Sequence, residues 1–72
     1  MIGEGMKVRF VPDFTDSSKY TPQERREHEV TAKIVYINWE HRYFTVEWVS
    51  EGRTLRESFK FAYIGKVVSV IG

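Results

Sequence analysis

The feature that most constrains this chain is a series of short runs in which apolar and polar residues alternate. In the first run, Met6, Val8 and Phe10 alternate with Lys7 and Arg9. A period of two places the apolar side chains on one face of an extended segment, which predicts a half-buried β-strand at 6–10. Pro12 ends the run, because proline has no amide hydrogen to donate to a strand ladder.

Four further strands are predicted at 30–38, 43–50, 54–59 and 67–71. The segment 30–38 is dense in β-branched residues, which favours a long central strand. Glu51 and Gly52 predict a tight hairpin turn, since glycine tolerates positive φ. The segment 61–65 is too short for an α-helix and too apolar for an exposed loop, so we expect a single 3₁₀ turn there.

The connection between the first two strands, 12–29, is long and polar. Residues 13–19 are rich in the turn-forming side chains Asp, Ser and Thr. Thr21, Pro22 and Glu24 have the spacing of a helix capping box, which predicts a short surface helix after it. At the other side of the first strand, residues 1–5 are expected to be a flexible lead-in to a domain at 6–72.

The predicted order is strand, long loop, strand, short loop, strand, tight hairpin, strand, 3₁₀ turn and strand. Over residues 6–72 this order resembles the small five-stranded SH3-like barrel, an all-β fold with a long first-hairpin loop. The resemblance implies that the strands close on themselves and so limit exposed sheet edges. An OB-type barrel is the alternative, but it usually needs a longer chain and a helix between its third and fourth strands. Eukaryotic SH3 domains hold proline-rich peptides with aromatic motifs that are missing here, where the corresponding stretches read Arg9–Phe14, Glu47–Val49 and Ala62–Ile64.

Three stretches, Lys33–Asn38, His41–Glu47 and Leu55–Phe61, resemble short barrel proteins encoded by phages and prophages of Gram-positive bacteria. This resemblance implies a phage-type accessory protein in the cytoplasm of a bacterial host. It names no activity, and a fold by itself does not imply one. Inhibition of a host defence or regulatory complex is one role that such a binding protein would suit.

Composition excludes several classes of function for this 72-residue chain. It has no cysteine, so neither disulfides nor thiolate metal sites are expected, and the formal net charge is only +1. His28 and His41 lack the spacing of metal ligands, and no nucleophile or phosphate-loop motif occurs. No apolar run is long enough to span a membrane. We therefore expect no enzyme activity, no cofactor, no metal and no membrane contact.

Trp39 is the most informative single residue, because it stands in a short connection between polar neighbours. Its ring could contact a partner, or it could fold back over the end of the barrel against Tyr36 or Tyr43. The first hypothesis is a binding protein, a monomer or small homo-oligomer, that docks on another protein through six residues: Trp39, Arg42, Tyr43, Tyr20, Arg25 and Arg26. The alternative hypothesis is a nucleic-acid-binding barrel, which adds a basic face made of Arg53, Arg56 and Lys60. Acidic residues next to these cations also allow a plain solvated surface.

Overall fold

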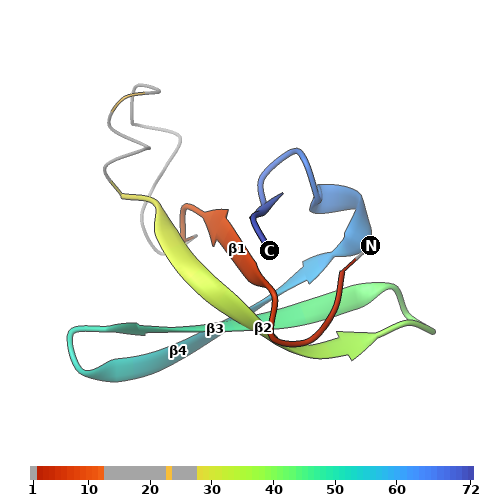
Figure 1. Cartoon of the computed structure of the whole chain (residues 1–72), viewed down its shortest axis with the longest axis horizontal. Coiled ribbons are helices and arrows are strands. Elements are labelled where there is room, and N and C mark those ends of the chain that lie inside the picture. Colours follow the sequence, from red (N-terminus) through yellow and green to blue (C-terminus); the bar gives the residue numbers. More distant parts are fainter. Residues whose placement is uncertain (1, 13–22, 24–27) are drawn as a thin grey trace.

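The computed structural model, which describes residues 2–12, 23 and 28–72, forms one antiparallel sheet (Figure 1). Its elements in chain order are β1 (Lys7–Phe10), β2 (Val30–Asn38), β3 (Tyr43–Ser50), β4 (Arg53–Lys60), η2 (Phe61–Tyr63) and β5 (Ser69–Val70). The strand order across the sheet is β4-β3-β2-β1-β5. The all-β prediction is confirmed, and so are the long strand, the tight hairpin and the 3₁₀ turn after β4. The residues predicted as a capping box lie outside the described part.

The last strand is shorter than the predicted 67–71, because the residues before it are held in a turn. The carbonyl oxygen of Tyr63 accepts the N–H groups of Lys66, Val67 and Val68 at 3.0, 3.1 and 3.3 Å. Gly65 makes this reversal with a φ of +83°. Ser69 and Val70 form the strand and lie opposite Arg9 and Val8 of β1, and the Ile71 N–H after them donates to the Lys7 carbonyl oxygen at 2.9 Å.

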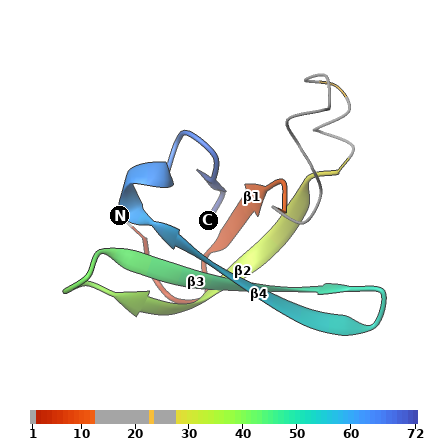
Figure 2. The same ribbon diagram turned by 180° about the vertical axis from the view of Figure 1, so that it is seen from behind.

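Strand β2 pairs with a different neighbour along each half. Its first half pairs with β1, from Phe10↔Val30 to Lys7↔Lys33. Its second half pairs with β3, and the register shifts between Ile34 and Tyr36. Such a bulge bends a strand and increases its twist. Because of this bend, one strand can pair with β1 at its start and with β3 at its end. In both views the β3–β4 hairpin extends well beyond β1 (Figures 1 and 2).

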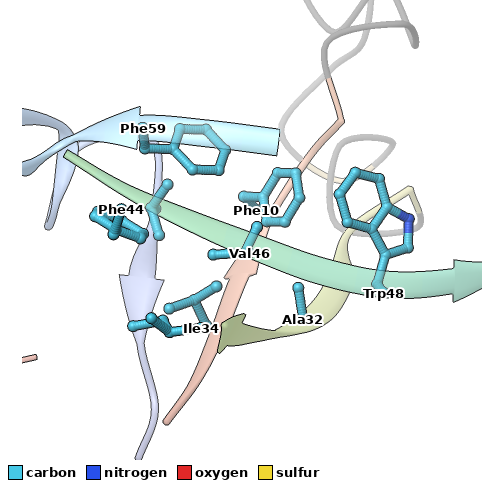
Figure 3. Packing of buried hydrophobic residues seen from close by; sticks show 9 residues of the cluster. Phe10, Ala32, Ile34, Phe44, Val46, Trp48 and Phe59 are labelled. Atoms are coloured by element: carbon cyan, nitrogen blue, oxygen red, sulfur yellow. The ribbon is translucent and has the colours of Figure 1, made fainter. Parts of the chain in front are cut away.

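The expected closure of the strands into a barrel is not seen, because β4 and β5 do not pair with each other in the described chain. The sheet curls instead, and β1 packs across β3 and β4 through its apolar face. The ring of Phe10 meets Trp48 at a centroid distance of 5.0 Å and Phe59 at 4.9 Å, both edge to face (Figure 3). Aromatic pairs prefer this arrangement. The buried core consists of Val8, Phe10, Ala32, Ile34, Phe44, Val46, Trp48, Phe59 and Val68.

The described part of the expected lead-in, residues 2–5, lies against the sheet. Ile2 packs on the core together with Met6. The Gly5 N–H donates to the carbonyl oxygen of Ile34 at 2.8 Å, and the Ile34 N–H donates to that of Met6 at 2.8 Å. These bonds continue the β1–β2 pairing beyond the start of β1.

Candidate functional site

The turn between β2 and β3, residues 39–42, is tied down at both of its ends. The His41 backbone N–H donates to Asn38 Oδ1 at 2.9 Å, which is the bond that an asparagine side chain makes to shape a turn. Arg42 has a φ of +56°, and its carbonyl oxygen accepts the Phe61 N–H at 3.0 Å. The turn is therefore joined to the start of η2, a segment that is distant in the sequence.

Trp39 is held against the core although it remains exposed. Its ring meets Phe61 at a centroid distance of 5.4 Å and an angle of 69°. Phe61 in turn stacks on the fully buried Phe44 at 6.2 Å. Trp39 nevertheless keeps 57% of its surface exposed. Of the two alternatives for this ring, the fold-back is seen, but against Phe61 instead of Tyr36 or Tyr43. The two tyrosine rings contact each other at 6.0 Å.

An open depression of about 760 Å³, which we call the Trp39 groove, lies between the β2–β3 turn and η2. It is lined by Trp39, His41, Arg42, Lys60, Phe61 and Ala62. Arg42 and Lys60 bring two positive charges beside aromatic rings, and no carboxylate belongs to this lining. The groove can therefore accept an apolar or planar group that carries negative charge next to it.

The structure brings together only part of the first predicted set. Trp39 and Arg42 both line the groove. Tyr43 lies beside it and faces Lys60 across the β3–β4 ladder. Tyr20, Arg25 and Arg26 lie outside the described residues.

The alternative basic face does not gather in one place. Arg53 is next to the β3–β4 turn, opposite Ser50, whereas Lys60 is at the other end of the same strand. At about 3.3 Å per residue, roughly 23 Å separates their backbones. Arg56, between them, donates from Nε and Nη2 to Glu47 Oε2 at 2.8 Å each. Of the three cations, Lys60 joins the Trp39 groove instead.

Reasoning from the sequence missed His41, Phe61 and Ala62 as parts of the groove. A signal for this was present in the predicted hairpin. A two-residue turn at Glu51 and Gly52 sets the register of the whole ladder, so that Tyr43 faces Lys60. Extending that register by one residue places Arg42 opposite Phe61, where the backbone bond is found.

Comparisons with known protein families, curated proteins and solved structures find no match to this chain. Within residues 2–12, 23 and 28–72, no three His, Cys, Asp or Glu side chains lie close enough together to hold a metal ion. No helix in the same part of the chain has the length and apolar character needed to cross a membrane. The geometry of the Trp39 groove is therefore the basis for interpreting function.

Proposed function

We propose that this chain is a non-catalytic binding module that docks on another protein through the Trp39 groove. The observation that supports this most is that Trp39 is 57% exposed while its ring is seated on Phe61. Tryptophan, tyrosine and arginine dominate the energetics of protein interfaces. Here Trp39 and Arg42 lie in one groove, with Tyr43 beside it.

The groove is organised before any partner arrives. The His41–Asn38 bond and the Arg42–Phe61 bond hold the turn, and the Phe61 ring holds the indole. Ordering a mobile side chain at an interface costs roughly 0.5–1.5 kcal/mol, so a side chain already held in place retains more of its contact energy. A partner would therefore lose little free energy in ordering Trp39.

A nucleic-acid partner is the second candidate, and the combination of Trp39 with Arg42 and Lys60 favours it. An exposed indole can stack on a nucleobase, worth roughly 1–3 kcal/mol, while cations contact phosphates. Two observations argue against a nucleic acid bound along β4. Arg56 is paired with Glu47, and Arg53 is distant from the groove. Among the described residues, Arg42 and Lys60 are then the cations that line the Trp39 groove, and we place the protein partner first.

The proposal includes an SH3-like architecture for the curled sheet. The strand order β4-β3-β2-β1-β5, the 3₁₀ turn before the last strand and the long connection after β1 support it. Together with the resemblance to phage-type barrels, this favours an accessory protein that acts on a complex of its bacterial host. Inhibition of a defence or regulatory complex is the role we propose for it there.

The test is a capture experiment from lysate of a Gram-positive host, with and without nuclease, comparing the wild type with Trp39→Ala. Val49→Ala is the matched control, because Val49 is 70% exposed and lies at the other end of β3. A protein that survives nuclease, is retained by Val49→Ala and is lost with Trp39→Ala supports the proposal. Circular dichroism of each variant verifies that the sheet is intact.

Loss of every partner on nuclease treatment would instead support the nucleic-acid candidate. A partner that binds Trp39→Ala as well as the wild type would show that the groove is not the docking site.

A further inference from the structure

Strand β4 has one backbone edge that no other described strand covers. It is the outermost strand on its side of the sheet and pairs only with β3. The two-residue turn makes Ser50 and Arg53 a hydrogen-bonded pair, and bonded pairs then alternate along an antiparallel ladder. Thr54, Arg56 and Ser58 therefore direct their N–H and C=O groups away from β3, and no described residue bonds to them. These groups form a template for one more strand.

The side chains along β4 alternate between the two faces of the sheet, and this alternation determines which residue types an added strand should carry. Thr54, Arg56, Ser58 and Lys60 are all exposed and occupy the outer face. Leu55 is half-buried on the opposite face, where it packs against the core. A strand laid along this edge would place alternate residues beside Lys60 and beside Arg56, and the others beside Leu55 and the half-buried Glu57. The Arg56 guanidinium bonds Glu47 through Nε and Nη2, and its side chain stays 66% exposed toward an added strand. Opposite charges directly across a ladder stabilise a sheet, and like charges destabilise it.

We infer that the free edge of β4 binds an extended segment of the partner protein whose residues alternate between acidic and apolar. This mode of binding, in which a peptide adds a strand to a sheet, takes its affinity from main-chain hydrogen bonds and its specificity from alternate side chains. The inference rests on the proposed protein partner and deepens it. Because Lys60 also lines the Trp39 groove, such a segment would end beside Trp39.

A second copy of the chain fits this edge less well. If two β4 strands paired antiparallel about Arg56, the two Arg56 side chains would face each other, pairing about Glu57 would do the same for two carboxylates, and pairing about Ser58 would bring Arg56 to face Lys60. Natural proteins use charged edge residues in this way to prevent self-association. Pairing about Leu55 avoids like charges but is limited to residues 53–57 by the hairpin turn. Nucleic acid cannot supply the regular N–H and C=O ladder that the edge requires.

The experiment uses the full chain labelled with ¹⁵N and a capped peptide of alternating glutamate and valine, seven residues long. At a peptide concentration about tenfold above Kd, the amides of Thr54, Arg56 and Ser58 should exchange with solvent about tenfold more slowly. The amides of Leu55 and Glu57, which face β3, serve as internal controls. A peptide in which lysine replaces glutamate should give no protection. Absence of protection by the glutamate peptide, or equal protection by both peptides, would overturn the inference.

Two further comparisons separate strand addition from plain charge attraction. In antiparallel addition the glutamates lie opposite Arg56 and Ser58 and their N–H groups face β4, so N-methylation of the glutamate amides should abolish binding. In parallel addition the valine N–H groups face β4, so methylation of the valine amides should abolish binding instead. Equal effects of both would contradict the inference. Ser58→Pro should weaken binding at least tenfold, because it removes an outward N–H. Ser58→Ala is its control, since it removes only the hydroxyl that bonds to Thr45 Oγ1 at 2.8 Å.

The same peptide is also tested on Trp39→Ala. Protection of the β4 amides in that variant would uphold the edge as a binding site even if the Trp39 groove failed its own test. Protein capture that depends on Trp39 but not on Ser58→Pro would uphold the groove and overturn the edge. A rise in oligomeric state without peptide would overturn the assignment of the edge to a partner protein.

Discussion

The two tryptophans occupy opposite ends of one series of aromatic contacts that runs through the protein. In order, these rings are Trp48, Phe10, Phe59, Phe44, Phe61 and Trp39. Trp48 is 7% exposed, and Trp39 at the other end is 57% exposed. One residue type thus contributes to the core at one end and to a binding surface at the other. The difference arises from position, since Trp48 faces inward on β3 and Trp39 lies in a turn.

The indole N–H of Trp48 is buried, and no described residue accepts a hydrogen bond from it. An unpaired buried donor lowers the stability of the fold. Trp48→Ala removes the whole ring and should lower the free energy of unfolding by about 3–5 kcal/mol. Trp48→Phe keeps most of the packing and removes the unpaired donor, whose burial costs about 1–3 kcal/mol. We expect it to change stability by no more than about 1 kcal/mol. Urea denaturation measures both variants, and a Phe variant as unstable as the Ala variant would contradict this expectation.

At the scale of the elements, the β3–β4 hairpin is the most regular part of the fold. Eight pairs continue without a shift from Tyr43↔Lys60 to Ser50↔Arg53. The turn that sets this register has positive φ at both residues, 51° at Glu51 and 76° at Gly52. That is the geometry of a type I′ turn, whose twist matches that of the strands it joins. The same register places Lys60 beside Arg42 and so builds the Trp39 groove.

Substitutions in this turn should act in opposite directions. Gly52→Ala should lower the free energy of unfolding by about 1–2 kcal/mol, because an L residue disfavours positive φ. Space is not the cause, since nothing lies within 4 Å of a Cβ added at this glycine. Glu51→Asn should raise the stability by up to about 1 kcal/mol, because asparagine tolerates this conformation. Thermal denaturation of both variants checks the signs, and two shifts in the same direction would contradict the assigned turn.

At the scale of the whole molecule, Phe10 joins the short strand β1 to the β3–β4 hairpin through its contacts with Trp48 and Phe59. Strand β5 depends on β1 in turn, because β1 is its one partner among the described strands. The curled sheet is therefore held by packing across its concave face as well as by its ladder. Removal of the Phe10 ring should therefore destabilise the whole sheet and not β1 and β5 alone.

Phe10→Ala should lower the free energy of unfolding by about 3–5 kcal/mol. A chain of 72 residues has only about 4–11 kcal/mol in total, at roughly 0.05–0.15 kcal/mol per residue. We expect the variant to lose most of its sheet cooperatively at moderate temperature. Far-ultraviolet circular dichroism and tryptophan fluorescence should therefore change together on heating. Loss of β1 and β5 alone, with an intact β2–β4 sheet in NMR spectra, would contradict this.

The sequence by itself determined the features that depend on neighbouring residues. Alternation and β-branched residues located β1 to β4 to within about one residue, since strand patterning has a period of two. Glu51 and Gly52 determined the hairpin and, with it, the pairing of Tyr43 with Lys60. Trp39 and Arg42 were recognisable as candidate site residues because an indole in a short polar turn is unusual.

Only the tertiary structure decided what depends on contacts between distant segments. The length of β5 depends on a turn that gathers three N–H groups onto the Tyr63 carbonyl, which no local pattern indicates. The sheet stays open because β4 and β5 do not meet in the described chain, although the strand order resembles that of a closed barrel. Arg56 was predicted in a basic face, but the structure pairs it with the carboxylate of Glu47 on the neighbouring strand. Lys60 lines the groove because η2 begins at the next residue. Charge and alternation follow from the order of residues along the chain, but which groups meet is set by how the sheet curls.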